Sequence, residues 1–161
     1  MNRVTIYPGT FDPITLGHVD VVERGLKLFD HVILAVASNP GKLPMFDLET
    51  RLAMVRETFA QHSNVTITGF NGLLVDLAHQ YHATSILRGL RAASDFEYEF
   101  QMATMNRRLD ADIETAFVMA REDYTFVSSR FIREISSMGG DVSTLVPSPV
   151  LKHLQKAFNQ S

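Results

Sequence analysis

Four short segments of the chain carry residue types that are suited to binding phosphate. The first is a turn, YPGTFDP over residues 7–13, which leads directly into TLGH over residues 15–18. Glycine lacks the Cβ that would keep a phosphate off the backbone, and free N–H groups at a helix start attract negative charge. A histidine in the first helical turn, His18, can donate a hydrogen bond to a phosphate oxygen. Phosphate chemistry is the first hypothesis; the alternative is a surface histidine beside a tight turn.

The second and third segments follow expected strands and are basic. Residues 38–42, SNPGK, end in Lys42, a mobile point charge suited to a phosphate, although a lysine in a loop is more often simply solvated. Arg88 and Arg91 flank Gly89 and Leu90, and arginine binds phosphate in bidentate fashion. Pairing of these arginines with nearby acidic residues, DFEYE over 95–99, is the competing account, and both accounts can hold together.

The fourth segment, FVSSRFIR over residues 126–133, places two hydroxyls at an expected helix start. Ser128 and Ser129 would suit helix capping, but capping does not explain Arg130 and Arg133 in the next turn. We therefore favour an anion site here as well.

Several other chemistries are disfavoured by what the sequence lacks. There is no GxxxxGK[ST] phosphate loop, no GxGxxG dinucleotide motif and no GxSxG nucleophile elbow. The absence of cysteine excludes disulfides, thiolate catalysis and cysteine-ligated metals. Asp12, before Pro13, is best interpreted as a turn-former, and we expect no protein-built metal site.

Composition limits the class of protein further. The 161 residues suit one domain spanning 1–161, and the net charge of −3 argues against broad nucleic-acid binding. No apolar run approaches the roughly 18 residues of a membrane span, and no secretory signal is apparent. We expect a cytoplasmic protein that binds neither nucleic acid nor membrane.

The elements that must position these segments alternate along the chain. We expect strands near residues 3–7, 31–37, 65–70, 85–88 and 115–119, and helices near residues 15–29, 48–60, 72–82, 96–109, 129–138 and 149–158. Such alternation predicts an α/β fold with a doubly wound, mostly parallel five-stranded sheet covered on both faces by helices. Ligands of such sheets bind at the carboxyl ends of the strands, where all four segments fall.

Three local signals refine the helices. Asp47 and Asp95 suit N-caps for the second and fourth helices, and Gly139-Gly140 suits a helix stop. The fourth helix has two apolar stripes, one of Tyr98, Met102, Met105 and Leu109, the other of Phe96, Phe100 and Ala103. We expect one stripe to face the sheet and the other to mediate self-association.

The four segments together resemble a known family. TLGH with SSRFIR is similar to the [TH]-x-G-H and S-S-x-x-x-R pair of the nucleotidyltransferase superfamily. YPGTFDP, RGLR and DFEYE narrow the resemblance to the bacterial phosphopantetheine adenylyltransferases, from about residue 4 to the final helix. The resemblance implies a Rossmann-like fold, a homohexamer and feedback inhibition by coenzyme A.

The implied reaction converts ATP and 4′-phosphopantetheine to dephospho-coenzyme A and pyrophosphate, with Mg²⁺ held mainly by ATP. The resemblance assigns the acceptor to Thr10, Lys42, Leu74 and Arg88. It assigns ATP to Thr10, Phe11, His18, Gly89, Leu90, Arg91, Glu99 and residues 124–130, namely Tyr124, Thr125, Phe126, Val127, Ser128, Ser129 and Arg130. Many family members have Ser or Thr where this chain has Arg130.

The expected chemistry needs no strong general base, because the nucleophile is already a phosphate oxyanion. Catalysis would rest on alignment and charge stabilisation, with His18 at the α-phosphate and Lys42 and Thr10 at the acceptor. Arg91 and Ser129 would hold the departing phosphates. Two alternatives stay open: another nucleotidyltransferase, acting on nicotinamide mononucleotide or using CTP, and a non-catalytic nucleotide sensor.

Overall fold

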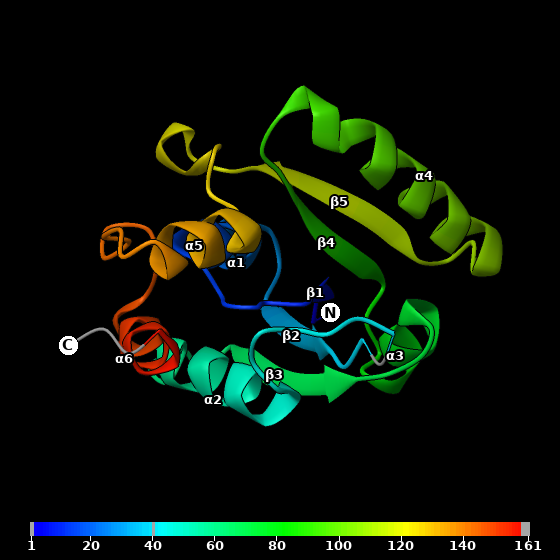
Figure 1. The fold of residues 1–161 in the computed structure, drawn as a ribbon. Helices are drawn as coiled ribbons and strands as arrows, with labels where there is room; N and C mark the ends of the chain where they lie inside the picture. The colour runs from blue at the N-terminus through cyan, green and yellow to red at the C-terminus, as the bar shows by residue number, and fades with distance from the viewer. Residues whose placement is uncertain (1, 40, 159–161) are drawn as a thin grey trace.

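The computed structural model describes residues 2–39 and 41–158, and its centre is a five-stranded sheet (Figure 1). The strands are β1 (Val4–Gly9), β2 (His31–Ala37), β3 (Val65–Phe70), β4 (Ser85–Leu90) and β5 (Glu114–Met119). They run in the order β3-β2-β1-β4-β5, and every pairing is parallel. The predicted Rossmann-like α/β class is confirmed.

Helices cover both faces of the sheet. They are α1 (Leu16–Leu28), α2 (Leu48–Thr58), α3 (Leu74–Gln80), α4 (Ala93–Leu109), α5 (Ser129–Ser137) and α6 (Ser148–Ala157), with a short 3-10 turn, Glu122–Tyr124. In Figure 1, α1, α2, α5 and α6 lie on one side of the sheet, and α3 and α4 lie on the other. Within the described ranges, none of these helices has the length and apolar character needed to cross a bilayer.

Two apolar cores follow from the alternation of side chains along the strands. Tyr7, Leu34 and Leu87 belong to the core beneath α1, α2, α5 and α6. Their neighbours Ile6, Ile33 and Ile86 belong to the smaller core beneath α3. Strands buried on both faces explain why the sequence shows continuous apolar runs there rather than alternation.

The ligand-binding edge is fixed by the order of the strands. After β1 the chain enters α1 on one face, whereas after β4 it enters α4 on the opposite face. Because β1 and β4 are neighbours in the sheet, their following segments diverge and leave a crevice at the carboxyl ends. Segments 10–15 and 91–92 border this crevice.

Local capping signals were confirmed at two of three places. Asp47 accepts a hydrogen bond from the Thr50 N–H at 2.8 Å and caps α2. Gly139 ends α5 with a φ of +79°, a backbone conformation that favours glycine. The prediction for Asp95 was wrong. Helix α4 begins at Ala93, three residues before the expected start, and the Asp95 carboxylate instead accepts from the N–H of Arg91 at 3.3 Å.

The prediction that one apolar stripe of α4 faces the sheet is confirmed, although this stripe does not pack directly against the strands. Among the residues of α4 whose burial is described, only Glu99 and Asn106 are buried, and both are polar. The stripe of Tyr98, Met102, Met105 and Leu109 lines a cavity between α4 and the sheet. Phe96 and Phe100 are about half exposed on another side, where their rings lie 5.9 Å apart. At the stripe of Tyr98, Met102, Met105 and Leu109 a cavity lies between α4 and the strands, whereas the ring of Phe96 lies 6.4 Å from that of Phe117 in β5.

Candidate active site

Two adjoining cavities occupy the carboxyl edge of the sheet. The first, of about 460 Å³, contains His18 and is called the His18 cavity. The second, of about 520 Å³, contains Lys42 and is called the Lys42 cavity. Five residues line both cavities and form their common wall: Pro8, Gly9, Arg88, Tyr98 and Glu99. The site can therefore hold two ligands side by side.

The ring of His18 is held in one orientation by its own helix start. Thr15 is the N-cap of α1, and its side chain accepts from the His18 N–H at 3.3 Å. In return, the Thr15 N–H donates to Nδ1 of His18 at 3.0 Å. Because Nδ1 accepts this hydrogen bond, the proton of the neutral ring lies on Nε2. His18 is thus prepared as a donor rather than as a base.

Aromatic rings and nearby charges keep His18 neutral. Its ring centroid lies 4.9 Å from that of Phe11 and 6.4 Å from that of Tyr7. Burial lowers the pKa of His18 to about 3, and the positive charges of Arg91 and Arg88 contribute in the same direction. Phe11 reaches the ring from a left-handed backbone conformation, with φ of +49°. The imidazole therefore stays uncharged at neutral pH when no anion is bound.

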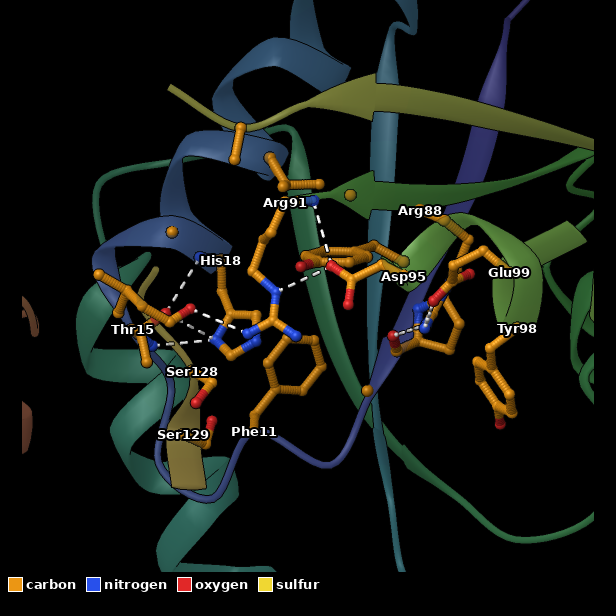
Figure 2. Close-up of a pocket in the computed structure, with 18 residues that line it drawn as sticks. Phe11, Thr15, His18, Arg88, Arg91, Asp95, Tyr98, Glu99, Ser128 and Ser129 are labelled. Carbon is orange, nitrogen blue, oxygen red and sulfur yellow. Dashed lines mark hydrogen bonds and ion pairs between the residues drawn. The ribbon is translucent and has the colours of Figure 1, made fainter. Parts of the chain in front are cut away.

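The two arginines of the RGLR segment both pair with carboxylates of α4, as Figure 2 shows. Arg88 donates to Glu99 through Nε at 2.8 Å and Nη2 at 2.6 Å, and its Nη1 donates to the Pro8 carbonyl at 2.8 Å. Arg91 donates to Asp95 at 3.3 Å and to the Val127 carbonyl at 3.1 Å. The competing account of ion pairing is thus confirmed, and both arginines still line the His18 cavity.

The four residues predicted for the acceptor lie together in the Lys42 cavity: Thr10, Lys42, Leu74 and Arg88. Lys42 is exposed, and among the described residues its ammonium has no hydrogen bond or ion pair. The hydroxyl oxygen of Thr10 accepts from Asn39 Nδ2 at 2.7 Å. One cation and one hydroxyl therefore stand ready for an anionic group at this end of the site. Pro40, in the same predicted loop, lies outside the described residues.

The serine–arginine segment on α5 holds the opening turn in place. The Ser129 hydroxyl donates to the Pro13 carbonyl at 2.7 Å, and Arg133 Nη1 donates to the Asp12 carbonyl at 2.6 Å. On the other side of the turn, the Asp12 carboxylate accepts from the N–H groups of Met45 and Phe46, at 2.8 and 2.9 Å. Asp12 ties segments together, which extends its predicted role as a turn-former.

The predicted nucleotide residues fall into three groups. Most of them line the His18 cavity: Phe11, His18, Gly89, Arg91, Glu99, Val127, Ser128 and Ser129. Thr10 lines the neighbouring cavity, whereas five others line neither: Leu90, Tyr124, Thr125, Phe126 and Arg130. Tyr124 nevertheless lies beside Gly17, where an added Cβ would come within 3.6 Å of the Tyr124 Cβ. Arg130 is exposed on α5.

Sequence reasoning missed residues whose roles depend on distant contacts. Asn39 was noted only as part of a turn, yet its Nδ2 donates to the Thr10 hydroxyl, and both residues line the Lys42 cavity. Tyr7 was taken as the end of a strand, and Tyr98 as an apolar helix residue; both line the His18 cavity. Burial raises the pKa of Tyr7, so its hydroxyl stays protonated. The signals for Tyr7 were its position at the end of a buried strand and at the start of the YPGTFDP turn, but neither indicated that its side chain lines the cavity.

The donor set offers no cage for a metal ion. Among the described residues, no three His, Asp or Glu side chains are grouped in a way that could hold one. The carboxylates of the His18 cavity, Asp95 and Glu99, are already paired with Arg91 and Arg88.

Comparisons with known proteins identify the family. Residues 6–135 match the model of the cytidylyltransferase-like family. The chain is 58% identical over 158 residues to phosphopantetheine adenylyltransferase of Methylococcus capsulatus, covering 98% of each chain. It is 51% identical over 160 residues to the protein of that name from an Anaeromyxobacter strain, covering 99% of this chain and 98% of that one.

A solved structure supports the fold alone. A protein from Vibrio parahaemolyticus, named as a candidate nicotinate-nucleotide adenylyltransferase, superposes with a TM-score of 0.74 at 21% identity, covering 100% of this chain and 97% of that one. The sequence relatives, which span nearly the whole chain, are the evidence for family. The chain belongs to the phosphopantetheine adenylyltransferase family, within the cytidylyltransferase-like nucleotidyltransferases.

Proposed function

We propose that the protein transfers the adenylyl group of ATP to 4′-phosphopantetheine. An oxygen of the acceptor's phosphate attacks the α-phosphorus of ATP, forming a new P–O bond. The bond between the α-phosphorus and the oxygen bridging to the β-phosphate breaks, and pyrophosphate leaves with that electron pair. The products are dephospho-coenzyme A and pyrophosphate, and no proton transfer is needed at the reacting phosphates.

The observation that carries the proposal is the common wall between the two cavities. ATP would occupy the His18 cavity, and phosphopantetheine would occupy the Lys42 cavity, whose partly apolar lining includes Leu74 and Met102. The two phosphates would then meet near Pro8, Gly9 and Arg88, which line both cavities. Holding two reactants in contact converts an encounter between molecules into an effectively intramolecular step.

Within this site, each polar residue has a distinct task. The Nε2–H of His18 would donate to a non-bridging oxygen of the α-phosphate, where negative charge accumulates as the bonds change. Lys42 and the Thr10 hydroxyl would place the attacking phosphate. Arg91, with the exposed N–H groups where Ser128 and Ser129 begin α5, would stabilise the departing pyrophosphate.

A Mg²⁺ ion fits this proposal only as a companion of ATP. Mg²⁺ keeps several waters and commonly binds through substrate phosphates rather than through a protein cage. Bound in that way, the ion would neutralise phosphate charge. The residues of this chain would bind and orient the complex.

The test is pyrophosphate release from the purified protein. We expect rapid release with ATP and 4′-phosphopantetheine, and little release with ATP and nicotinamide mononucleotide or with CTP and a phosphorylated alcohol. Release with another pair instead would assign a different nucleotidyl transfer. ATP binding without release for any acceptor would favour the non-catalytic sensor.

The proposal includes a homo-oligomer, and the family resemblance implies a hexamer. Phe96 and Phe100 on α4 line neither cavity, and each is about half exposed. Monomers rarely present such a patch, and a second copy of the chain would cover it. We expect Phe100→Ser to shift the protein towards smaller species in light scattering, whereas Gln101→Ser, at an exposed neighbouring position, should not. A wild-type monomer at micromolar concentration would refute the assembly.

Feedback inhibition by coenzyme A follows from the same site. Coenzyme A contains the whole of the product, so it would occupy both cavities and compete with both substrates.

A cytoplasmic location is part of the proposal too, and the absence of cysteine from the sequence is compatible with it.

A further inference from the structure

Arg51, on α2, is fully buried and contacts neither cavity, yet it joins three segments that border the Lys42 cavity. Its Nη1 donates to the carbonyl oxygens of Thr10 at 2.8 Å and Ala37 at 2.7 Å. Its Nε donates to the carbonyl of Phe46 at 2.9 Å. These carbonyls belong to the turn after β1, the end of β2 and the segment before α2.

The charge of Arg51 is solvated by backbone dipoles. No described carboxylate lies within ion-pair distance of its guanidinium. Burial lowers its pKa, and the charges of Asp12 and Asp47 act in the opposite direction. Burying a cation is costly unless its donors are hydrogen-bonded, and here three carbonyls accept from Nε and Nη1 of the guanidinium. An apolar side chain could fill the same space without that cost, so packing alone does not account for Arg51.

The segments that Arg51 joins are those that carry the acceptor-side ligands. Thr10 presents its hydroxyl to the Lys42 cavity, and Asn39 donates to that hydroxyl at 2.7 Å. Asn39 follows Ala37 by two residues, and its carbonyl accepts from the Lys42 N–H at 3.0 Å. A shift of the Thr10 or Ala37 carbonyl would therefore separate groups that must converge on one phosphate.

The nucleotide side of the site is held by different contacts. His18 is oriented by Thr15, and the Asp12-Pro13 turn is held from α5 by Arg133 and Ser129. Loss of Arg51 would leave all of these in place. On the basis of the proposed function, we infer that Arg51 is a positioning residue for the acceptor phosphate, acting through Thr10 and the loop of Asn39 and Lys42.

The test compares Arg51→Lys and Arg51→Ala with the matched control Arg56→Lys, at an exposed position of the same helix. Lysine keeps the charge, but one nitrogen cannot replace two that are spaced as in a guanidinium. We expect the KM for phosphopantetheine to rise at least about tenfold, equivalent to roughly 1.4 kcal/mol, in both Arg51 variants. The Kd for ATP should stay within about twofold, and Arg56→Lys should resemble the wild type.

A second readout separates positioning from general stability. Added guanidinium at low millimolar concentration should bind in the space left by Arg51→Ala and lower the KM for phosphopantetheine towards the wild-type value. If Arg51→Ala does not fold, Arg51→Lys carries the kinetic test. The inference would be overturned if the Kd for ATP and the KM for phosphopantetheine rose by the same factor. It would also be overturned if the KM for phosphopantetheine were unchanged in a folded variant.

Hydrogen exchange makes the outcome independent of the reaction. Arg51→Lys should increase amide exchange in residues 9–12 and 41–46, and leave exchange in residues 15–20 unchanged. Unchanged exchange in the first two segments would refute the positioning role even if the acceptor were another molecule. A wild-type protein that does not use phosphopantetheine would refute the proposed function, and the exchange result would still decide the role of Arg51.

Discussion

The backbone N–H of Thr15 donates to Nδ1 of His18 at 3.0 Å, and this contact links a helix cap to the chemistry of the site. The same two residues form a reciprocal capping box at the start of α1. In most capping boxes the third residue is Glu or Gln, which would place an acceptor here. Histidine satisfies the cap with one nitrogen and leaves a donor on the other, so the local fold itself selects the tautomer that a phosphate requires.

Replacement of His18 by alanine should lower kcat by at least about 10²-fold, the scale for loss of one transition-state donor. The KM for ATP should change little, because this donor acts mainly where charge develops. His18→Gln, which retains an N–H donor, should lose less activity than alanine. Pyrophosphate release measures both, and circular dichroism confirms that each variant is folded at the assay temperature. An unchanged kcat in folded His18→Ala would remove the residue from the mechanism.

The low pKa of His18 predicts a specific loss of stability in acid. In the folded protein this pKa is about 3, below its ordinary value of 6.5, so between these values the unfolded chain binds a proton that the native state does not. The contribution of the neutral ring to the free energy of unfolding is fully present above about pH 6.5 and is lost as the pH falls towards 3. Measured by urea unfolding, the free energy of unfolding should therefore decline less between pH 7 and pH 4 for His18→Gln than for the wild type. If the unfolding free energies of the two proteins fell in parallel with pH, the lowered pKa of His18 would be contradicted.

The sequence was sufficient for features that depend on short-range pattern. Short runs rich in apolar and β-branched residues located all five strands, of which β1 and β2 are mostly buried, and the Asp47 cap and the Gly139 stop are local events. At α4 the pattern indicated that one apolar stripe faces the sheet, but it did not indicate that a cavity lies between that stripe and the strands. The side of α4 that faces Arg88 carries Glu99, because a binding cavity lies there. A charged residue therefore stands on a helix face that would usually be apolar. Periodicity cannot distinguish an apolar stripe that lines a cavity from one that packs in a core.

The contacts that organise the site join residues far apart in the chain. Arg133 reaches the Asp12 carbonyl across 121 positions, and Arg51 reaches the Thr10 carbonyl across 41. Nothing in the neighbourhood of either arginine in sequence indicates a carbonyl partner. The motif identified Arg133 as important, but only the fold shows that it supports the turn instead of lining either cavity.

Substitution of Arg133 should therefore destabilise the protein, whereas substitution of Arg130 should not. Arg133→Met removes the 2.6 Å hydrogen bond to the Asp12 carbonyl and the 3.7 Å ion pair with its carboxylate. The expected loss is about 1–3 kcal/mol of unfolding free energy, because partly buried acceptors are left without a donor. Arg130→Met, at an exposed position on the same helix, should change stability by less than about 0.5 kcal/mol. Urea unfolding distinguishes the two, and equal effects would contradict the turn-supporting role of Arg133.

Arg88 and Glu99 should behave as a coupled pair that also binds the acceptor. The side chain of Arg88 is 29% exposed and that of Glu99 is 9% exposed, so Arg88→Ala leaves a nearly buried carboxylate without its partner. We expect this variant to lose stability and to bind phosphopantetheine at least about tenfold more weakly, with a smaller effect on ATP. Adding Glu99→Gln should restore stability because the unpaired charge is gone, but it should not restore acceptor binding, which needs the guanidinium. Calorimetric titration and thermal unfolding of the single and double variants measure the two effects separately. Recovery of acceptor affinity in the double variant would show that Arg88 acts only by neutralising Glu99, and an effect confined to ATP would assign Arg88 to the nucleotide.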